Sequence, residues 1–282
     1  MLAPEQKAHF DVFGFLIFRQ AFTPKEIDKT ASEAEIIWED RRNKNSSQNK
    51  GISSDEFVEL RPTLTNLLVD DRIHGTIEGL LGPDFIFAGS EGQVTSHRYH
   101  GWHTDRPGDE EELSYLRIKV MIYLDPLDKG SGCLRVIPGS HQLPLHQEIE
   151  PEEHHQHAET VKPFDVTGSD MPCFPLECRP GDVIFFNHSL WHGMFNGTKG
   201  RRYIALKFAA RPLTDKQLAS LHYYTKHMFE PADNLLKSDN PIIRRMVEDL
   251  PRLGTKKVPA FIPYSDDFKA SLYHQREENS IN

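Results

Sequence analysis

Three side chains of types that bind transition metals occur in two short motifs. His103 and Asp105 lie two residues apart in the run Gly101-Trp-His-Thr-Asp105, and on an extended strand side chains at i and i+2 share one face. His192, in Ser189-Leu-Trp-His-Gly193, follows the apolar run 182–187. Two histidines and one carboxylate on one side of a metal ion leave positions open for other ligands and for oxygen. We therefore predict a mononuclear metal site formed by His103, Asp105 and His192.

The elements that must position these residues are mainly strands. From residue 85 onward, short runs rich in β-branched and aromatic residues are separated by Gly, Pro, Asp and Asn, as is typical of an all-β sandwich or barrel. These runs cover residues 85–89, 93–99, 115–125, 133–138, 182–188 and 201–210. Helical spacing of apolar residues predicts helices over 23–39, 71–81, 215–228 and 241–250. We expect a single domain over 1–282, with helical support in 1–83, a β core in 84–211 and a helical extension in 212–282.

One predicted strand, over 115–124, has two different faces. Leu116, Ile118, Val120, Ile122 and Leu124 form a wholly apolar face. The other face carries Tyr115, Arg117, Lys119, Met121 and Tyr123. This second face either meets solvent or lines a polar cavity, and periodicity alone is compatible with both.

Taken together, the motifs resemble those of the phytanoyl-CoA dioxygenase family of iron(II)/2-oxoglutarate-dependent oxygenases. The His-x-Asp pair is followed by a Gly-rich stretch ending in Pro138-Gly-Ser-His141, then by Gly181-Asp182 before an apolar strand, then by His192-Gly193 and an arginine. The resemblance runs from about residue 10 to about residue 211. It implies a double-stranded β-helix, a cupin-like jelly-roll, with iron at one open end.

The resemblance also implies roles for individual residues. His103, Asp105 and His192 match the iron ligands, and Arg201 matches the arginine that binds the distal carboxylate of the co-substrate 2-oxoglutarate through its planar fork. Arg202 is the second choice, because the loop after His192 is shorter than in many members. Arg202 is in phase with an apolar strand face, whereas Arg201 is in phase with Tyr203 and Lys207, so we favour Arg201. Parity further suggests a substrate cavity lined by Tyr99, Arg117, Lys119, Met121 and Tyr123.

The activity implied is a dioxygenase reaction that uses O2, most simply hydroxylation of a small organic molecule with release of succinate and CO2. Asp105 stands where related halogenases carry Ala or Gly, which favours oxygen transfer over halogenation. Desaturation and cyclisation are compatible with the same residues. Two alternatives from other classes are a non-catalytic jelly-roll protein that binds a metabolite and an O2-independent metal isomerase or lyase of the cupin type.

The amino-acid composition limits the kinds of molecule that this protein is expected to bind. The formal net charge of −9 disfavours nucleic acid and anionic membranes, so we expect a small-molecule substrate. The three cysteines Cys133, Cys173 and Cys178 lack the even number and regular spacing of a disulfide framework, so we expect them to be reduced. The N-terminal residues also lack the pattern of a signal peptide. Both features predict a cytoplasmic protein. Residues 150–159 hold three histidines among acidic residues; they can form a metal-binding tract, but a solvated insertion with a lid role is the favoured interpretation.

Overall fold

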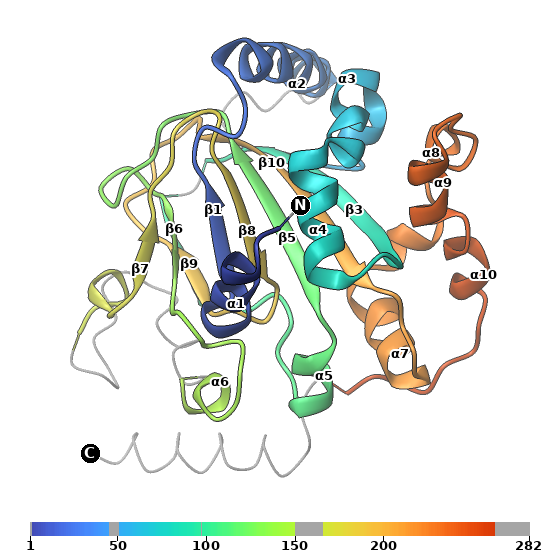
Figure 1. The fold of residues 1–282 in the computed structure, drawn as a ribbon. Coiled ribbons are helices and arrows are strands. Elements are labelled where there is room, and N and C mark those ends of the chain that lie inside the picture. Colours follow the sequence, from blue (N-terminus) through green and yellow to red (C-terminus); the bar gives the residue numbers. More distant parts are fainter. Residues whose placement is uncertain (1, 45–50, 97, 150–165, 263–282) are drawn as a thin grey trace.

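The computed structural model describes residues 2–44, 51–96, 98–149 and 166–262, and these contain two facing antiparallel sheets (Figure 1). The larger sheet has the order β1 (Phe15–Phe18), β8 (Val183–Asn187), β5 (Arg117–Tyr123), β10 (Arg202–Ala210), β3 (Phe85–Val94) and β2 (Ile52–Asp55). The smaller sheet has the order β4 (His100–His103), β9 (His192–Met194), β6 (Leu134–Val136) and β7 (Phe174–Leu176). This arrangement is a double-stranded β-helix, so the predicted jelly-roll is confirmed.

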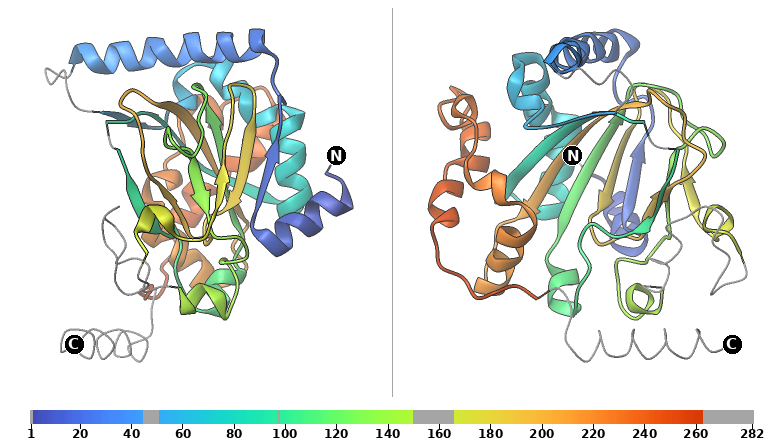
Figure 2. Two further views of the ribbon diagram at one scale, coloured as in Figure 1. Left: turned by 90° about the vertical axis from the view of Figure 1, so that its left-hand side faces the viewer. Right: turned by 180° about the vertical axis from the view of Figure 1, so that it is seen from behind.

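Helices lie around this β core, many of them against the outer side of the larger sheet (Figure 2). The α-helices are α1 (Pro4–Phe13), α2 (Pro24–Lys44), α3 (Pro62–Thr65), α4 (Asp71–Leu81), α5 (Glu110–Ser114), α6 (Leu145–Glu148), α7 (Asp215–Tyr224), α8 (Asp233–Leu236), α9 (Pro241–Val247) and α10 (Leu250–Gly254). Short 3-10 turns add η1 (Val58–Leu60), η2 (Asn66–Val69), η4 (Gly168–Asp170) and η5 (Lys226–Phe229). None of the helices within the described ranges has the length and apolar character needed to cross a membrane.

The predicted helices correspond to α2, α4, α7 with η5, and α9 with α10. Helix α4 begins where the side chain of Asp70 accepts the backbone N–H of Arg72, and it ends at Gly82, whose φ of 83° suits glycine. The prediction for the N-terminal segment was incomplete, because β1 and β2 also come from it and form the two edges of the larger sheet. Each of these strands has only four residues, too few for a clear alternation in sequence.

The two faces of β5 contact different parts of the protein. Ile118, Val120 and Ile122 join the large core between the six-stranded sheet and the helices. Met121 and Tyr123 belong to a second core, between the two sheets, which also contains the buried free cysteines Cys133 and Cys178. Neither face of the strand is therefore a solvent-facing surface. The histidine-rich stretch 150–159 lies outside the described residues.

A β-bulge in β3 changes which of its side chains point into the jelly-roll. Phe208 pairs with Phe87 and Leu206 pairs with Ser90, so Ala88 and Gly89 together lie opposite Lys207. An extra residue shifts the alternation that follows it. Glu91 consequently points toward the interior of the jelly-roll, where it contacts lysines from two neighbouring strands.

Candidate metal centre

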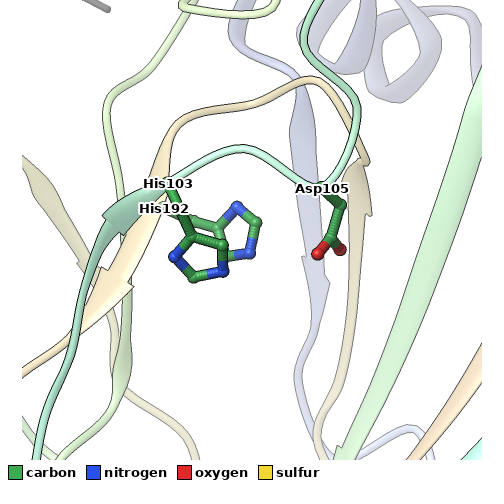
Figure 3. A group of neighbouring side chains, drawn as sticks. All are labelled: His103, Asp105 and His192. Carbon is green, nitrogen blue, oxygen red and sulfur yellow. The ribbon is translucent and has the colours of Figure 1, made fainter. Parts of the chain in front are cut away.

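The three predicted metal ligands meet at one end of the smaller sheet. His103 is the last residue of β4 and pairs directly across the ladder with His192, the first residue of β9, so both imidazoles lie on one face. Their ring centroids are 4.1 Å apart. Asp105 lies two residues past the end of β4, with its carboxylate facing the two rings (Figure 3). One ligand atom from each of the three residues lies within 4.8 Å of the other two.

Backbone carbonyls fix the orientation of both imidazoles. Nδ1 of His103 lies 2.8 Å from the carbonyl oxygen of Gly101, and Nδ1 of His192 lies 2.8 Å from that of Leu190. Each Nδ1 therefore carries the proton that it donates, and each Nε2 keeps a free lone pair for a metal. Burial, and secondarily His192, lowers the pKa of His103 to about 4. Burial also lowers the pKa of His192, so both rings are neutral near pH 7, as metal binding requires.

A row of alternating charges extends from Asp105 into the sheet interior. Lys119 Nζ lies 3.5 Å from Asp105 Oδ2 and 3.2 Å from Glu91 Oε1, and Lys207 Nζ lies 3.0 Å from Glu91 Oε2. Burial opposes the charged form of Lys119, but the two carboxylates raise its pKa above the usual range. Burial also opposes ionisation of Asp105, yet the ammonium group of Lys119 holds its pKa well below the usual value. Lys119 thus keeps Asp105 ionised and in place.

Replacing Lys119 with methionine is expected to destabilise the metal-free protein by about 3 kcal/mol, because Asp105 and Glu91 lose the cation between them. Added Mn²⁺ should then raise the melting temperature more in this variant than in the wild type, since the ion supplies the missing positive charge. Chemical unfolding and thermal shift with and without Mn²⁺ measure both effects. Lys207→Met is the matched control, with a smaller loss because Lys207 is more exposed and Glu91 keeps Lys119. An equal loss in both variants would contradict this account.

The cluster opens into a cavity of about 520 Å³ between the two sheets. Four of the five side chains predicted to line a cavity do line it: Tyr99, Lys119, Met121 and Tyr123. Arg201 and the three candidate ligands contribute to the same cavity. Sequence reasoning missed other residues that line it, among them Glu91, Gln93, Phe186 and Tyr203.

Arg117 does not line this cavity, contrary to the expectation from strand parity. It is the first residue of β5, and its buried guanidinium pairs with Glu112 on α5 and donates a 2.8 Å hydrogen bond to Ser220 Oγ on α7. Ser220 Oγ in turn donates to Glu112 Oε1 over 2.7 Å. Side-chain direction at the end of the strand is therefore set by these tertiary partners, and Arg117 joins α5 to α7.

The two adjacent arginines differ in their surroundings. Arg201 is 7% exposed and faces the cavity, where its Nη1 donates to the carbonyl of Gly132 and its Nε has no partner among the described residues. Arg202 is half-buried on the other side of the strand, where it forms an ion pair with Asp125. Its Nη2 donates to Asp125 Oδ1 over 2.7 Å and its Nε donates to Asp125 Oδ2 over 3.3 Å. Arg201 thus presents guanidinium N–H groups to the cavity, whereas the fork of Arg202 is engaged with Asp125.

Stability is expected to fall as the pH drops below about 6.5. Burial lowers the pKa of several histidines from 6.5, namely His74, His103, His141, His146, His188 and His192. Above pH 6.5 these groups are neutral in both states. Below it the unfolded chain binds protons that the folded chain does not, which costs about 1.4 kcal/mol per pH unit for each histidine until the folded pKa is reached.

Urea unfolding of the metal-free protein between pH 7.5 and 5.5 measures this slope. His188 is buried, and neither ring nitrogen has a partner among the described residues. His188→Met should therefore reduce the slope of the unfolding free energy against pH by the contribution of about one proton. A free energy of unfolding that stays constant across this pH range would refute the expectation.

The fold and the site define a class. This is a jelly-roll protein in which two histidines and one carboxylate converge at the mouth of an interior cavity, the ligand set of non-haem iron(II) oxygenases. Comparison with protein families matches phytanoyl-CoA dioxygenase (PhyH) over residues 10–203. The chain belongs to this family.

Solved structures share the fold at low sequence identity. HygX from Streptomyces hygroscopicus, with iron bound, is 19% identical with a TM-score of 0.59, and the match covers 76% of this chain and 88% of HygX. The form of HygX with nickel and 2-oxoglutarate bound is 20% identical with the same TM-score, over 76% and 89% of the two chains. The non-haem alpha-ketoglutarate-dependent epimerase SnoN, from nogalamycin biosynthesis, is 16% identical with a TM-score of 0.53, over 72% and 81%.

Curated proteins give shorter matches. Uncharacterized proteins of Mycobacterium bovis and Mycobacterium tuberculosis are each 27% identical to this chain over 89 residues. These matches cover 32% of this chain and 26% of the relatives, so they span about a quarter of the length of those proteins.

Proposed function

We propose that this protein is an iron(II)/2-oxoglutarate-dependent oxygenase that acts on a small organic molecule. His103, Asp105 and His192 would hold the iron, and Arg201 would bind the distal carboxylate of 2-oxoglutarate. The observation that carries the proposal is that the clustered ligand atoms and the inward-facing guanidinium of Arg201 share one cavity. The iron of HygX, and the 2-oxoglutarate in its nickel form, support the same assignment.

The residues present suit an iron(II) ion. Both Nε2 atoms are free to coordinate because both Nδ1 atoms are engaged with carbonyls, and Asp105 adds a carboxylate held by Lys119. Two imidazoles and one carboxylate would leave the remaining positions of the ion for co-substrate and O2. Iron bound there would supply the oxidative chemistry, while the protein supplies its ligands and an enclosed space.

The cavity walls suit a dicarboxylate at one side and a substrate at the other. Arg201 has a guanidinium edge without a protein carboxylate among the described residues, which fits a ligand that brings its own. Tyr99 lies at an exposed position of the lining, toward solvent, so the substrate would enter past it. The half-polar, half-apolar wall formed by Gln93, Met121 and Tyr203 would orient the substrate beside the metal.

Anaerobic titration of 2-oxoglutarate into the iron(II)-loaded protein tests the proposal. We expect the weak visible absorption band of a chelated 2-oxo acid, and after admission of O2 with a suitable substrate, succinate in step with product. A protein that holds iron but shows no band and no 2-oxoglutarate binding would refute the assignment and favour the O2-independent cupin-type alternative. Tight co-substrate binding without succinate from any substrate tried would favour the non-catalytic binding protein.

The outcome of the reaction is a separate part of the proposal. Hydroxylation is the simplest result for an enzyme that keeps a carboxylate at Asp105. The fold also supports other outcomes, since SnoN is an epimerase that depends on alpha-ketoglutarate. Mass analysis of the product made under ¹⁸O2 separates them, because hydroxylation incorporates an oxygen atom from O2 and epimerisation does not.

A further inference from the structure

A second cavity, of about 190 Å³, is lined by Lys207, which pairs with Glu91 of the metal-centre cavity. Its walls come mainly from β3, the 3-10 turn η1 and the C-terminal elements η5 and α8 to α10. Its apolar wall includes Phe87, Leu235 and Leu250. This volume is below the roughly 300–1,000 Å³ of pockets for drug-sized ligands, so it suits a smaller molecule.

The polar side of this cavity is acidic. Asp55 and Glu56 lie at its exposed rim, and the buried carboxylate of Glu59, 8% exposed, forms part of its wall. Lys207 also lines the wall, but its positive charge is already neutralised by Glu91, with which it pairs at 3.0 Å. The net charge presented to a ligand is therefore negative.

Glu59 is held in place without a compensating cation. Ser90 Oγ accepts the backbone N–H groups of Phe57 at 2.8 Å and Val58 at 3.0 Å, so its own proton is directed to Glu59 Oε2. Within the described residues, no lysine or arginine pairs with Glu59, and its burial raises the pKa of the carboxyl. A buried carboxylate without a cation is costly, and a bound ammonium group would offset that cost.

The backbone around the cavity is shaped locally. The bulge in β3 places Gly89, with a φ of 107°, at the wall, where a Cβ would meet no atom within 4 Å. Glu56, at the rim, has a φ of 54°, which a non-glycine residue adopts only at some cost in energy. Bulges and strained backbone conformations are concentrated at functional sites. Both occur here beside the buried carboxylate of Glu59, which supports a ligand-binding role for this cavity.

From these observations we propose that the second cavity binds a small primary amine, with its ammonium group on Glu59 and its apolar body against Phe87, Leu235 and Leu250. This site is separate from the metal centre and does not depend on the function proposed for it.

Calorimetric titration of the metal-free protein at pH 7.5 tests the site, with phenethylamine as the probe and 2-phenylethanol as its neutral counterpart. We expect the amine to bind about 10- to 100-fold more tightly than the alcohol, the usual effect of a hydrogen bond to a charged group. Glu59→Gln keeps the shape and the bond with Ser90, and it should remove this preference. Glu39→Gln, on the exposed side of α2, changes the net charge equally and should leave binding intact.

Two further variants test whether the amine binds in this cavity rather than at the metal centre. Ala232→Leu extends into the cavity and should block both probes. His103→Ala, at the metal centre, should bind the amine with wild-type affinity. No binding to the wild type, an unchanged amine preference in Glu59→Gln, or loss of amine binding in His103→Ala would each overturn the proposal.

Discussion

Replacing His103 with alanine is expected to weaken iron(II) or Mn²⁺ binding by more than about 100-fold. The variant removes one of three protein ligands, whereas changes to groups that merely orient such ligands already cost about 10- to 100-fold. His103 pairs across the sheet ladder with His192, and its Nδ1 is engaged with the carbonyl oxygen of Gly101, which holds Nε2 toward the metal position. Calorimetry with Mn²⁺, and the visible spectrum of the Co²⁺-loaded protein, measure the loss.

His100→Ala is the matched control. His100 stacks on His103 with ring centroids 4.0 Å apart and lines the same cavity, but it is not part of the three-residue cluster. We expect its removal to change metal affinity by only a few-fold. Equal losses in the two variants would show that the ligand set has been assigned incorrectly, whereas wild-type affinity in His103→Ala would mean that the metal binds elsewhere.

Replacing Arg201 with alanine is expected to weaken 2-oxoglutarate binding about 100-fold while leaving metal affinity nearly unchanged. Two hydrogen bonds from a guanidinium to a carboxylate in a buried site are together worth about 3 kcal/mol, and each 1.4 kcal/mol is a factor of ten. The absorption band of the 2-oxoglutarate complex should therefore form only at much higher co-substrate concentration.

Arg202→Ala provides the comparison, because the two residues are adjacent and carry the same charge. Arg202 is bound to Asp125 rather than facing the cavity, so its loss should lower stability modestly and leave 2-oxoglutarate affinity as in the wild type. If Arg202→Ala instead abolished co-substrate binding, the assignment of Arg201 would be refuted.

Much of this site follows from local sequence rules. The His-x-Asp spacing predicts that His103 and Asp105 lie close together, although Asp105 comes just after the end of β4. The jelly-roll then brings His192 to them on β9, the antiparallel partner of β4. Strand alternation also separates Arg201 from Arg202, because β10 is regular where it begins. Alternation is reliable here since both faces of the strand are buried and each carries a different kind of residue.

Other features depend on contacts that local sequence does not encode. Alternation through β3 would place Glu91 on the same face as Phe87, but the bulge at Ala88 and Gly89 turns it inward to meet Lys119. Glycine within a strand can mark a bulge, and Gly89 is such a signal in β3. Without the position of Glu91, the pairing of Lys119 with Asp105 could not be anticipated, and strand parity predicts only that Lys119 lines the cavity.

Arg117 failed as a cavity residue for a similar reason. Its parity matches that of Lys119, yet its partner Ser220 lies 103 residues further along the chain. A buried guanidinium follows the carboxylate that neutralises it, and Glu112 lies behind the strand rather than in the cavity. Parity therefore predicts side-chain direction best in the middle of a strand, away from such pairs.

The packing of the C-terminal helices has a consequence for how this chain can recombine with its relatives. The family match ends at residue 203, inside β10, but Leu218, Leu221 and Leu250 belong to the same core as strand residues such as Ile118 and Phe208. A chimera joined to a relative at the end of the matched region would divide the central strand β10 between two proteins. It would also pack the sheet of one protein against the C-terminal helices of the other. Viable chimeras should instead exchange the jelly-roll and the helices through Gly254 as a single block.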